Sequence, residues 1–251
     1  MSGLTAGLWA ARLRALTPAR VGLECTGVSQ QTRDLLAFQR AHALARDAVH
    51  APLDVAAVAA EFEAICGGPV LRLHAQASDR ATYLQRPDLG RILDEPSLAE
   101  LKRLRSPEGC DLVVVVADGL SALAVERHAA PVLRALWPRL EGWRIAPACV
   151  VAQGRVAIGD AVGEALGARL CLVLIGERPG LSSPDSMGAY ITWEPRTGRT
   201  DAERNCISNI RAEGLSYEEA AVQIGFYLHE ARQRKLTGVA LKDESRMLEK
   251  G

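Results

Sequence analysis

Short apolar runs recur along the second half of the chain. Residues 111–119 (DLVVVVADG) form a β-branched run that ends in Asp-Gly, a pattern typical of a strand buried on both faces. Further runs predict strands at residues 143–154, 168–180 and 188–195. The sequence therefore predicts a sheet whose first strand in this half is covered on both sides.

Helix-forming segments separate these runs. Helices are predicted at residues 120–140, with a break near Pro131, at residues 155–168, where Gly167 marks the end, and at residues 215–236. Strands that alternate with helices of about 10–15 residues favour right-handed βαβ units and a mostly parallel sheet. The predicted fold class is α/β, with a Rossmann-like, mostly parallel sheet and flanking helices.

The first 108 residues have a different, mainly helical pattern. Apolar residues recur at helical spacing in TRDLLAFQRAHALARDAVH. Helices are predicted at residues 32–50, 53–66 and about 97–104, and a short strand at residues 69–75. We therefore expect a mainly helical amino-terminal region, 1–108, followed by a Rossmann-like α/β domain, 109–251.

Composition and charge narrow the range of partners. The chain of 251 residues has 30 Lys and Arg against 30 Asp and Glu, so its formal net charge is zero. A neutral chain has no long-range field that attracts phosphate backbones, and nucleic acid is not expected as a partner. The six cysteines are scattered without a CxxC pair, which argues against a zinc site or a disulfide framework and favours the cytoplasm. No apolar stretch approaches the roughly 18–20 residues of a membrane span, so no membrane partner is expected.

Three predicted strands end in glycine and polar residues. The segments are VVVVADGLS, VVAQGRVAIGD and LVLIGERPGLSS. Because the carboxyl ends of parallel strands meet at one edge of a sheet, these segments are expected to form a crevice for a small molecule. The chain has neither a GxxxxGK[ST] loop nor a GxGxxG turn, so ATP and NAD are not expected. Asp118 either contacts the ligand or caps the following helix, and capping is the better interpretation.

Nucleophilic and metal chemistry have weaker signals. Cys206 is a candidate nucleophile if Arg204, two residues before it, lowers the pKa of its thiol, but a structural thiol is the favoured interpretation. No GxSxG elbow surrounds Ser121. His42 and His50 are eight residues apart instead of on adjacent helical turns, and we expect no metal site.

Several segments carry a specific resemblance to a known family. Residues 166–221 include the motifs GERPGLSSPDS and CISNI, and residues 16–54, 83–94, 114–126 and 154–160 share the likeness. These segments resemble the small subunit of ethanolamine ammonia-lyase over nearly the whole chain. The family's enzyme, a carbon–nitrogen lyase, converts ethanolamine to acetaldehyde and ammonia with adenosylcobalamin, and the resemblance implies that this chain is a subunit of such a complex.

The resemblance also implies a division of labour between subunits. The large subunit holds the substrate in a (β/α)8 barrel, and the roughly four strands predicted in the carboxyl half of this chain are too few for the eight of a barrel. We therefore expect no catalytic residue here. By motif, the cobalamin contacts fall on Val156 in GRVAIGD, Glu177 in GERPG and Cys206 in RNCISNI. The competing interpretations are a packing valine, a glutamate paired with Arg178 and a buried thiol.

Further expectations concern the cofactor, the assembly and its location. Many cobalamin domains carry DxHxxG, but the nearest match, Asp47 to His50, has the wrong spacing, so adenosylcobalamin is expected to bind base-on. The chain is expected to form a cytoplasmic hetero-oligomer with several copies of each subunit. Some relatives carry a long amino-terminal extension that directs them into bacterial microcompartments; about 15 residues precede LTPAR here, which argues against encapsulation by that route. Two other functions stay open: a stand-alone enzyme with Cys206 as nucleophile, and an assembly protein.

Overall fold

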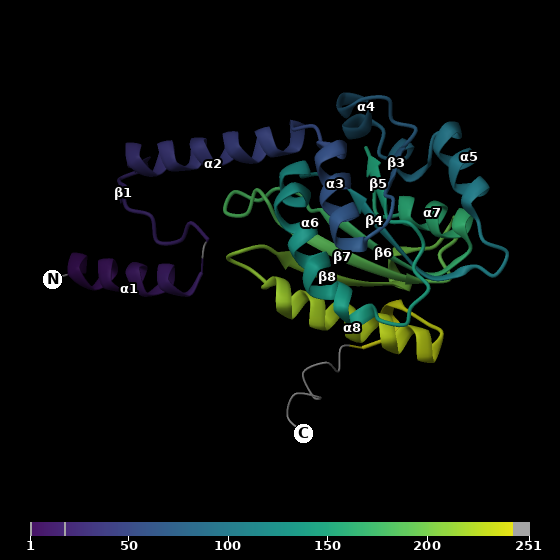
Figure 1. The fold of residues 1–251 in the computed structure, drawn as a ribbon. Coiled ribbons are helices and arrows are strands. Elements are labelled where there is room, and N and C mark those ends of the chain that lie inside the picture. Colours follow the sequence, from purple (N-terminus) through teal and green to yellow (C-terminus); the bar gives the residue numbers. More distant parts are fainter. Residues whose placement is uncertain (1, 18, 243–251) are drawn as a thin grey trace, which may run out of the picture.

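A six-stranded sheet forms the centre of the molecule, for which a computed structural model describes residues 2–17 and 19–242, with side chains from residue 8 (Figure 1). Its strands are β3 (Leu71–His74), β4 (Cys110–Ala117), β5 (Cys149–Ala152), β6 (Ala168–Gly176), β7 (Met187–Trp193) and β8 (Arg204–Ile210). Their order in space is β3-β5-β4-β6-β7-β8. The first four are mutually parallel, whereas β7 is antiparallel to both of its neighbours. The predicted α/β class with a mostly parallel sheet is confirmed.

Strand β4 lies inside the sheet and every one of its residues is buried, as its continuous apolar run predicted. Because successive side chains of a strand point to opposite faces, β4 supplies two separate apolar clusters. Leu112, Val114 and Val116 belong to one cluster. Val113, Val115 and Ala117 belong to the other. The sheet is therefore the middle layer of three.

Helices form the two outer layers. Helices α3 (Val55–Cys66), α6 (Ala122–Leu136) and α8 (Tyr217–Arg234) pack on one face, and α5 (Glu95–Leu104) and α7 (Ile158–Leu166) pack on the other (Figure 1). Shorter helical segments are α4 (Arg80–Gln85), η1 (Leu89–Arg91), η2 (Trp137–Leu140), η3 (Asp201–Glu203) and η4 (Gly238–Ala240). Side-chain caps define several starts: Asp54 accepts a hydrogen bond from Ala57 N at α3, and Ser216 forms a capping box with Glu219 at α8. Gly167 ends α7 in the left-handed conformation, as predicted.

Two sequence-based expectations about these elements were wrong or incomplete. Helix α6 runs through Pro131 without the expected break. Its buried face on both sides of Pro131, which includes Val125 and Leu133, packs into one apolar cluster and keeps the two halves aligned. Strand β8 was missed, because two of its buried positions are polar, Arg204 and Asn205, and its burial pattern does not alternate.

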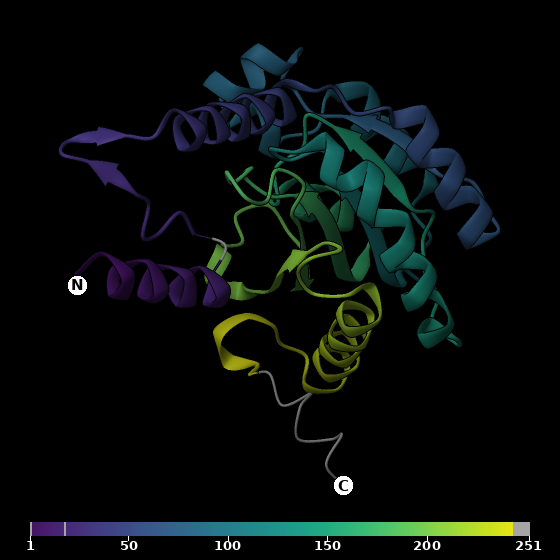
Figure 2. The same cartoon turned by 90° about the vertical axis from the view of Figure 1, so that its left-hand side faces the viewer.

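The amino-terminal segment projects from this body as an arm (Figures 1 and 2). It consists of α1 (Ser2–Leu16), a small hairpin of β1 (Cys25–Thr26) and β2 (Ser29–Gln30), and α2 (Thr32–His50). Among the side chains of the arm that the structure describes, eight large apolar ones are exposed: Leu8, Trp9, Leu16, Val28, Leu35, Leu36, Phe38 and Leu44. Exposed apolar residues gathered on a projecting element are typical of an interaction surface.

The amino-terminal region also contributes to the central sheet. Strand β3, from the part expected to be mainly helical, pairs with β5 through residues 71–74, and α3 packs against α6. The division between residues 108 and 109 stays a prediction.

Candidate functional site

The carboxyl ends of β4, β5 and β6 meet at one edge of the sheet and enclose a cavity. Neighbouring strands β4 and β5 continue into helices on opposite faces, α6 and α7, and such a divergence opens a crevice in α/β proteins. The cavity has a volume of about 400 Å³. It is lined by Gly119 and Leu120 after β4, Arg155 and Val156 after β5, Ile175 to Arg178 at the end of β6, Tyr83 of α4 and Tyr190 of β7. The predicted convergence of the three strand ends is confirmed.

Val156 lies in a tightly held turn between β5 and α7. The amide of Gly154 donates to the carboxylate of Asp118 at 3.0 Å, and the amide of Arg155 donates to the carbonyl of Gly90 at 2.7 Å. A Cβ added at Gly154 would stand 2.9 Å from the Cβ of Ala117, so only glycine fits there without a shift. Val156 itself is half-buried, packs against the cluster beneath α7 and lines the cavity.

Glu177 follows β6 and lines the same cavity. Its carboxylate accepts hydrogen bonds from the hydroxyl of Ser186 and, at 3.3 Å, from the amide of Asn209 at the end of β8. It forms no ion pair with Arg178 in the described part of the chain, so the surface-pair interpretation is wrong. The structure therefore brings Val156 and Glu177 together around one space, with the carboxylate held by two donors.

Cys206 lies beside the cavity instead of in its lining. It is an exposed residue of β8 opposite Tyr190 of β7. Desolvation by the surrounding protein raises the pKa of Cys206, and the nearby carboxylates of Glu177 and Asp201 add to this effect. Arg204 does not lower that pKa, as the nucleophile alternative required, because its guanidinium is bound to Asp160. A thiol with a raised pKa is a poor nucleophile, which argues against the stand-alone enzyme.

Asp118 has a role that the sequence did not reveal. The cap of α6 is Ser121, whose hydroxyl accepts from the amide of Ala124, so the capping interpretation of Asp118 is wrong. Asp118 is buried, and Arg80 donates to its carboxylate at 3.1 Å. Burial raises the pKa of Asp118, whereas Arg80 and the amide of Gly154 oppose this shift. The carboxylate thus joins the loops after β4 and β5 and carries no capping function.

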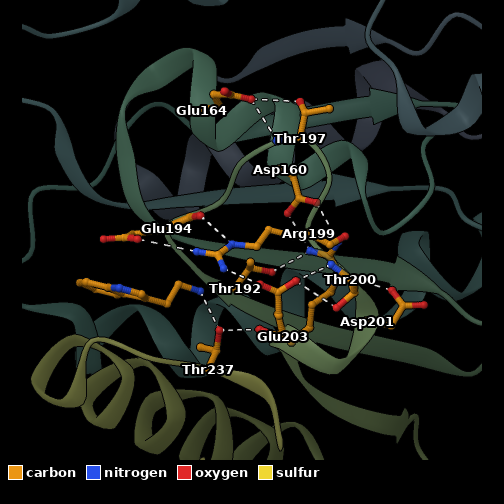
Figure 3. Close-up of polar contacts among 12 residues, drawn as sticks. Asp160, Glu164, Thr192, Glu194, Thr197, Arg199, Thr200, Asp201, Glu203 and Thr237 are labelled. Carbon is orange, nitrogen blue, oxygen red and sulfur yellow. Dashed lines mark hydrogen bonds and ion pairs between the residues drawn. The ribbon is translucent and has the colours of Figure 1, made fainter. Parts of the chain in front are cut away.

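A polar network fixes the strand that carries Cys206 (Figure 3). Both terminal nitrogens of Arg204 in β8 donate to the carboxylate of Asp160 in α7 at 2.7 Å, and Nη1 also donates to Thr192 at 3.1 Å. The two charged side chains are 2% and 3% exposed. Arg199 and Glu203 pair beside them and close the loop before β8. The network therefore couples α7, the helix after Val156, to β8, the strand of Cys206. The sequence indicated this network only through polar residues in a segment without apolar periodicity.

Neither metal-binding clusters nor helices that could cross a membrane occur among the described residues. In residues 2–17 and 19–242, no three side chains of His, Cys, Asp or Glu come together in a way that suits a metal ion. Within the same residues, no helix combines the length and the apolar character needed to cross a membrane.

Comparison with known proteins identifies the family. The family model described as "Ethanolamine ammonia-lyase light chain (EutC)" matches residues 9–242. An ethanolamine ammonia-lyase small subunit from Xanthomonas campestris pv. campestris is 58% identical over 94% of this chain and 88% of its own length. The one from Ralstonia nicotianae is 55% identical over 99% of this chain and 93% of its own length. The one from Pseudomonas syringae pv. tomato is 54% identical over 94% of this chain and 83% of its own length. The chain belongs to the family of ethanolamine ammonia-lyase small subunits.

Proposed function

We propose that this chain is the non-catalytic, cofactor-contacting subunit of an adenosylcobalamin-dependent ethanolamine ammonia-lyase, which converts ethanolamine to acetaldehyde and ammonia. The observation that carries the proposal is the cavity at the carboxyl edge of the sheet, where Val156 and Glu177 line one space. Membership of the small-subunit family supports the reaction and a large-subunit partner.

The residues around the cavity fit one part of a corrin cofactor. A volume of about 400 Å³ is that of a small-molecule pocket, so it accommodates an edge of a molecule as large as cobalamin. The amide side chains of a corrin present both donors and acceptors. Glu177 offers carboxylate oxygens to the amide donors. The wall of the cavity also contains a donor, Nε of Arg155, that is buried without a hydrogen-bond partner in the described chain.

Each predicted contact has a distinct role in holding the cofactor. When bound, adenosylcobalamin supplies the radical chemistry, and the protein supplies binding, orientation and shielding. Glu177, oriented by Ser186 and Asn209, accepts hydrogen bonds from corrin amides. Val156 offers an apolar surface beside the main chain of its turn. Cys206, next to Tyr190, presents a small side chain at the rim where a larger one would collide.

The large subunit is the proposed partner of the amino-terminal arm. The exposed apolar residues on α1 and α2, among them Trp9 and Phe38, require a cover that the described part of this chain does not provide. We propose a hetero-oligomer with several copies of each subunit, in which the large subunit's barrel carries the substrate and all catalytic residues. We place this complex in the cytoplasm, either free or inside a bacterial microcompartment.

Reconstitution tests the proposal. Ammonia release from ethanolamine with adenosylcobalamin is measured for this chain alone, the large subunit alone and the two mixed, and activity is expected in the mixture alone. In the mixture, Glu177→Ala is expected to raise the dissociation constant for the cofactor about tenfold, the effect of one hydrogen bond to a charged group. Glu141→Ala, at an exposed position remote from the cavity lining, is the matched control. Turnover by this chain alone would refute the proposal and direct attention to Cys206.

A further inference from the structure

Arg155, at the wall of the cavity, is a cation without a counter-charge among the residues that the structure describes. It follows β5 directly before Val156 and lines the cavity. Its Nε is buried and has no hydrogen-bond partner, and none of its guanidinium nitrogens has an ion-pair partner among the described residues. A buried donor that stays unpaired destabilises a protein by losing its water without a replacement, so its persistence points to a ligand that supplies the acceptor.

The position of Arg155 is fixed although its donors are free. Its amide bonds to the carbonyl of Gly90, and its guanidinium carbon lies 4.3 Å from the centre of the Tyr83 ring. The ring of Tyr83 also interacts with Arg80, whose guanidinium carbon is 4.7 Å from the same centre. Tyr83 is itself fully buried and donates to the carbonyl of Gly154 at 3.2 Å. A guanidinium held by aromatic stacking and backbone contacts is preorganised for a ligand.

The charges around the cavity leave a positive surplus at this point. The charge of Arg80 is matched by Asp118. One carboxylate oxygen of Glu177, Oε2, accepts from Ser186 and Asn209, and the carboxylate pairs with neither Arg155 nor Arg178 in the described structure. Arg178 is exposed and lines the same cavity. Two arginines therefore line a space with one carboxylate, and neither of them forms an ion pair with it in the described structure, which favours an anionic group in the ligand.

We propose that Arg155 binds the phosphodiester group of the cofactor's nucleotide tail. The inference rests on the proposed function, because it assumes that cobalamin occupies this cavity. Among the groups that cobalamin presents to a protein, the phosphodiester is the anionic one, whereas the corrin side chains are neutral amides. The planar fork of a guanidinium matches two phosphate oxygens, and such charge-assisted bonds are about twice as strong as neutral ones.

The test uses the complex with the large subunit and two ligands, adenosylcobalamin and adenosylcobinamide, which lacks the nucleotide tail and its phosphodiester. Dissociation constants for both are measured by absorbance titration for the wild type, Arg155→Met and Arg155→Lys. Arg134→Met, at an exposed position on α6, is the control. Arg155→Met is expected to weaken adenosylcobalamin binding about ten- to hundredfold and to leave adenosylcobinamide binding unchanged. Arg155→Lys, which keeps the charge but not the fork, is expected to lie between the wild type and Arg155→Met.

The possible results separate the inference from the function on which it rests. If wild-type complex binds adenosylcobalamin and Arg155→Met binds it equally well, the inference is overturned and the proposed function stands. If Arg155→Met weakens both ligands to the same extent, Arg155 contacts the corrin and not the phosphodiester, and the inference is again overturned. If the wild-type complex binds neither ligand, the proposed function fails and the inference fails with it.

Discussion

The ion pair between Asp160 and Arg204 allows a sharp test of how the site is held together. The pair joins α7 to β8 through two bonds of 2.7 Å, and its side chains are 2% and 3% exposed. Arg204→Met removes one charge and leaves the other buried. Loss of one partner from a buried pair typically destabilises a protein by about 3–5 kcal/mol. We expect Arg204→Met to lower the free energy of unfolding by this amount.

The assay is urea unfolding, followed by circular dichroism at pH 7. With a slope of about 3 kcal/mol per molar urea for a chain of this size, the midpoint is expected to fall by roughly 1–1.7 M. The double variant Asp160→Asn/Arg204→Met removes both charges and is expected to recover most of the loss. Arg86→Met is the control, because Arg86 and Asp88 also form a short pair, at 2.6 Å, but both side chains are more than half exposed. That control is expected to leave the midpoint unchanged.

The pH dependence of Arg204→Met adds a second readout. Burial already raises the pKa of Asp160, and the bonds from Arg204 oppose this shift. Without Arg204 the folded-state pKa of Asp160 is expected to rise further above its ordinary value of 3.8. A raised carboxyl pKa contributes stability at low pH that is lost as the pH rises, so the deficit is expected to be smaller at pH 4 than at pH 7. Equal midpoints for Arg204→Met and Arg86→Met at pH 7 would refute the reasoning.

Three further predictions concern single positions. Bonds from Thr200 and Arg199 lower the pKa of Glu203 from 4.5 to about 2, so the stability that they contribute is lost as the pH falls between these values. Glu203→Gln is therefore expected to make the free energy of unfolding depend less on pH in this range, which unfolding midpoints from pH 2 to 6 check. Gly119→Ala is expected to destabilise the chain by about 2 kcal/mol or more, because φ is +55° and the new Cβ would stand 2.2 Å from the carbonyl oxygen of Gly176. Thermal unfolding measures this loss against the control Gly68→Ala, where the new Cβ would have no neighbour within 4 Å. Cys206→Ala is expected to preserve turnover of the reconstituted complex at saturating cofactor, and loss of turnover there would support the nucleophile instead.

Periodicity predicted the sheet and its covering helices well where burial is continuous. The apolar run of β4 marks a strand covered on both sides, and Gly167 marks the end of α7, because in each case one physical constraint decides the residue type. Strand β8 escaped prediction because it carries Arg204 and Asn205 inward, where long-range partners satisfy them. The hydrophobic pattern marks such residues as polar, and it does not show the distant side chains or carbonyls that pair with them.

The same limit separates the predicted from the missed parts of the site. The strand-end glycines and the polar residues after them could be placed at one edge from chain order alone. The role of Asp118 could not: the sequence favoured it as the cap of α6, and only the geometry shows that Ser121 caps this helix instead. Arg80 and Tyr83 come from a short helix far away in sequence, and no local pattern connects them with the loop after β5.

Hydrogen bonds within this chain join the loops around the cavity, which has a consequence for assembly. The loop after β4 donates from Leu120 to the carbonyl of Gly176 at the end of β6, and Asp118 holds the amide of Gly154 after β5. Glu177 in turn binds the amide of Asn209 at the end of β8. Because bonds within this chain join the walls of the cavity to one another, we expect its shape not to depend on a partner. The proposed cofactor surface is thus expected to be formed before the subunits meet, so that binding loses little free energy to its ordering.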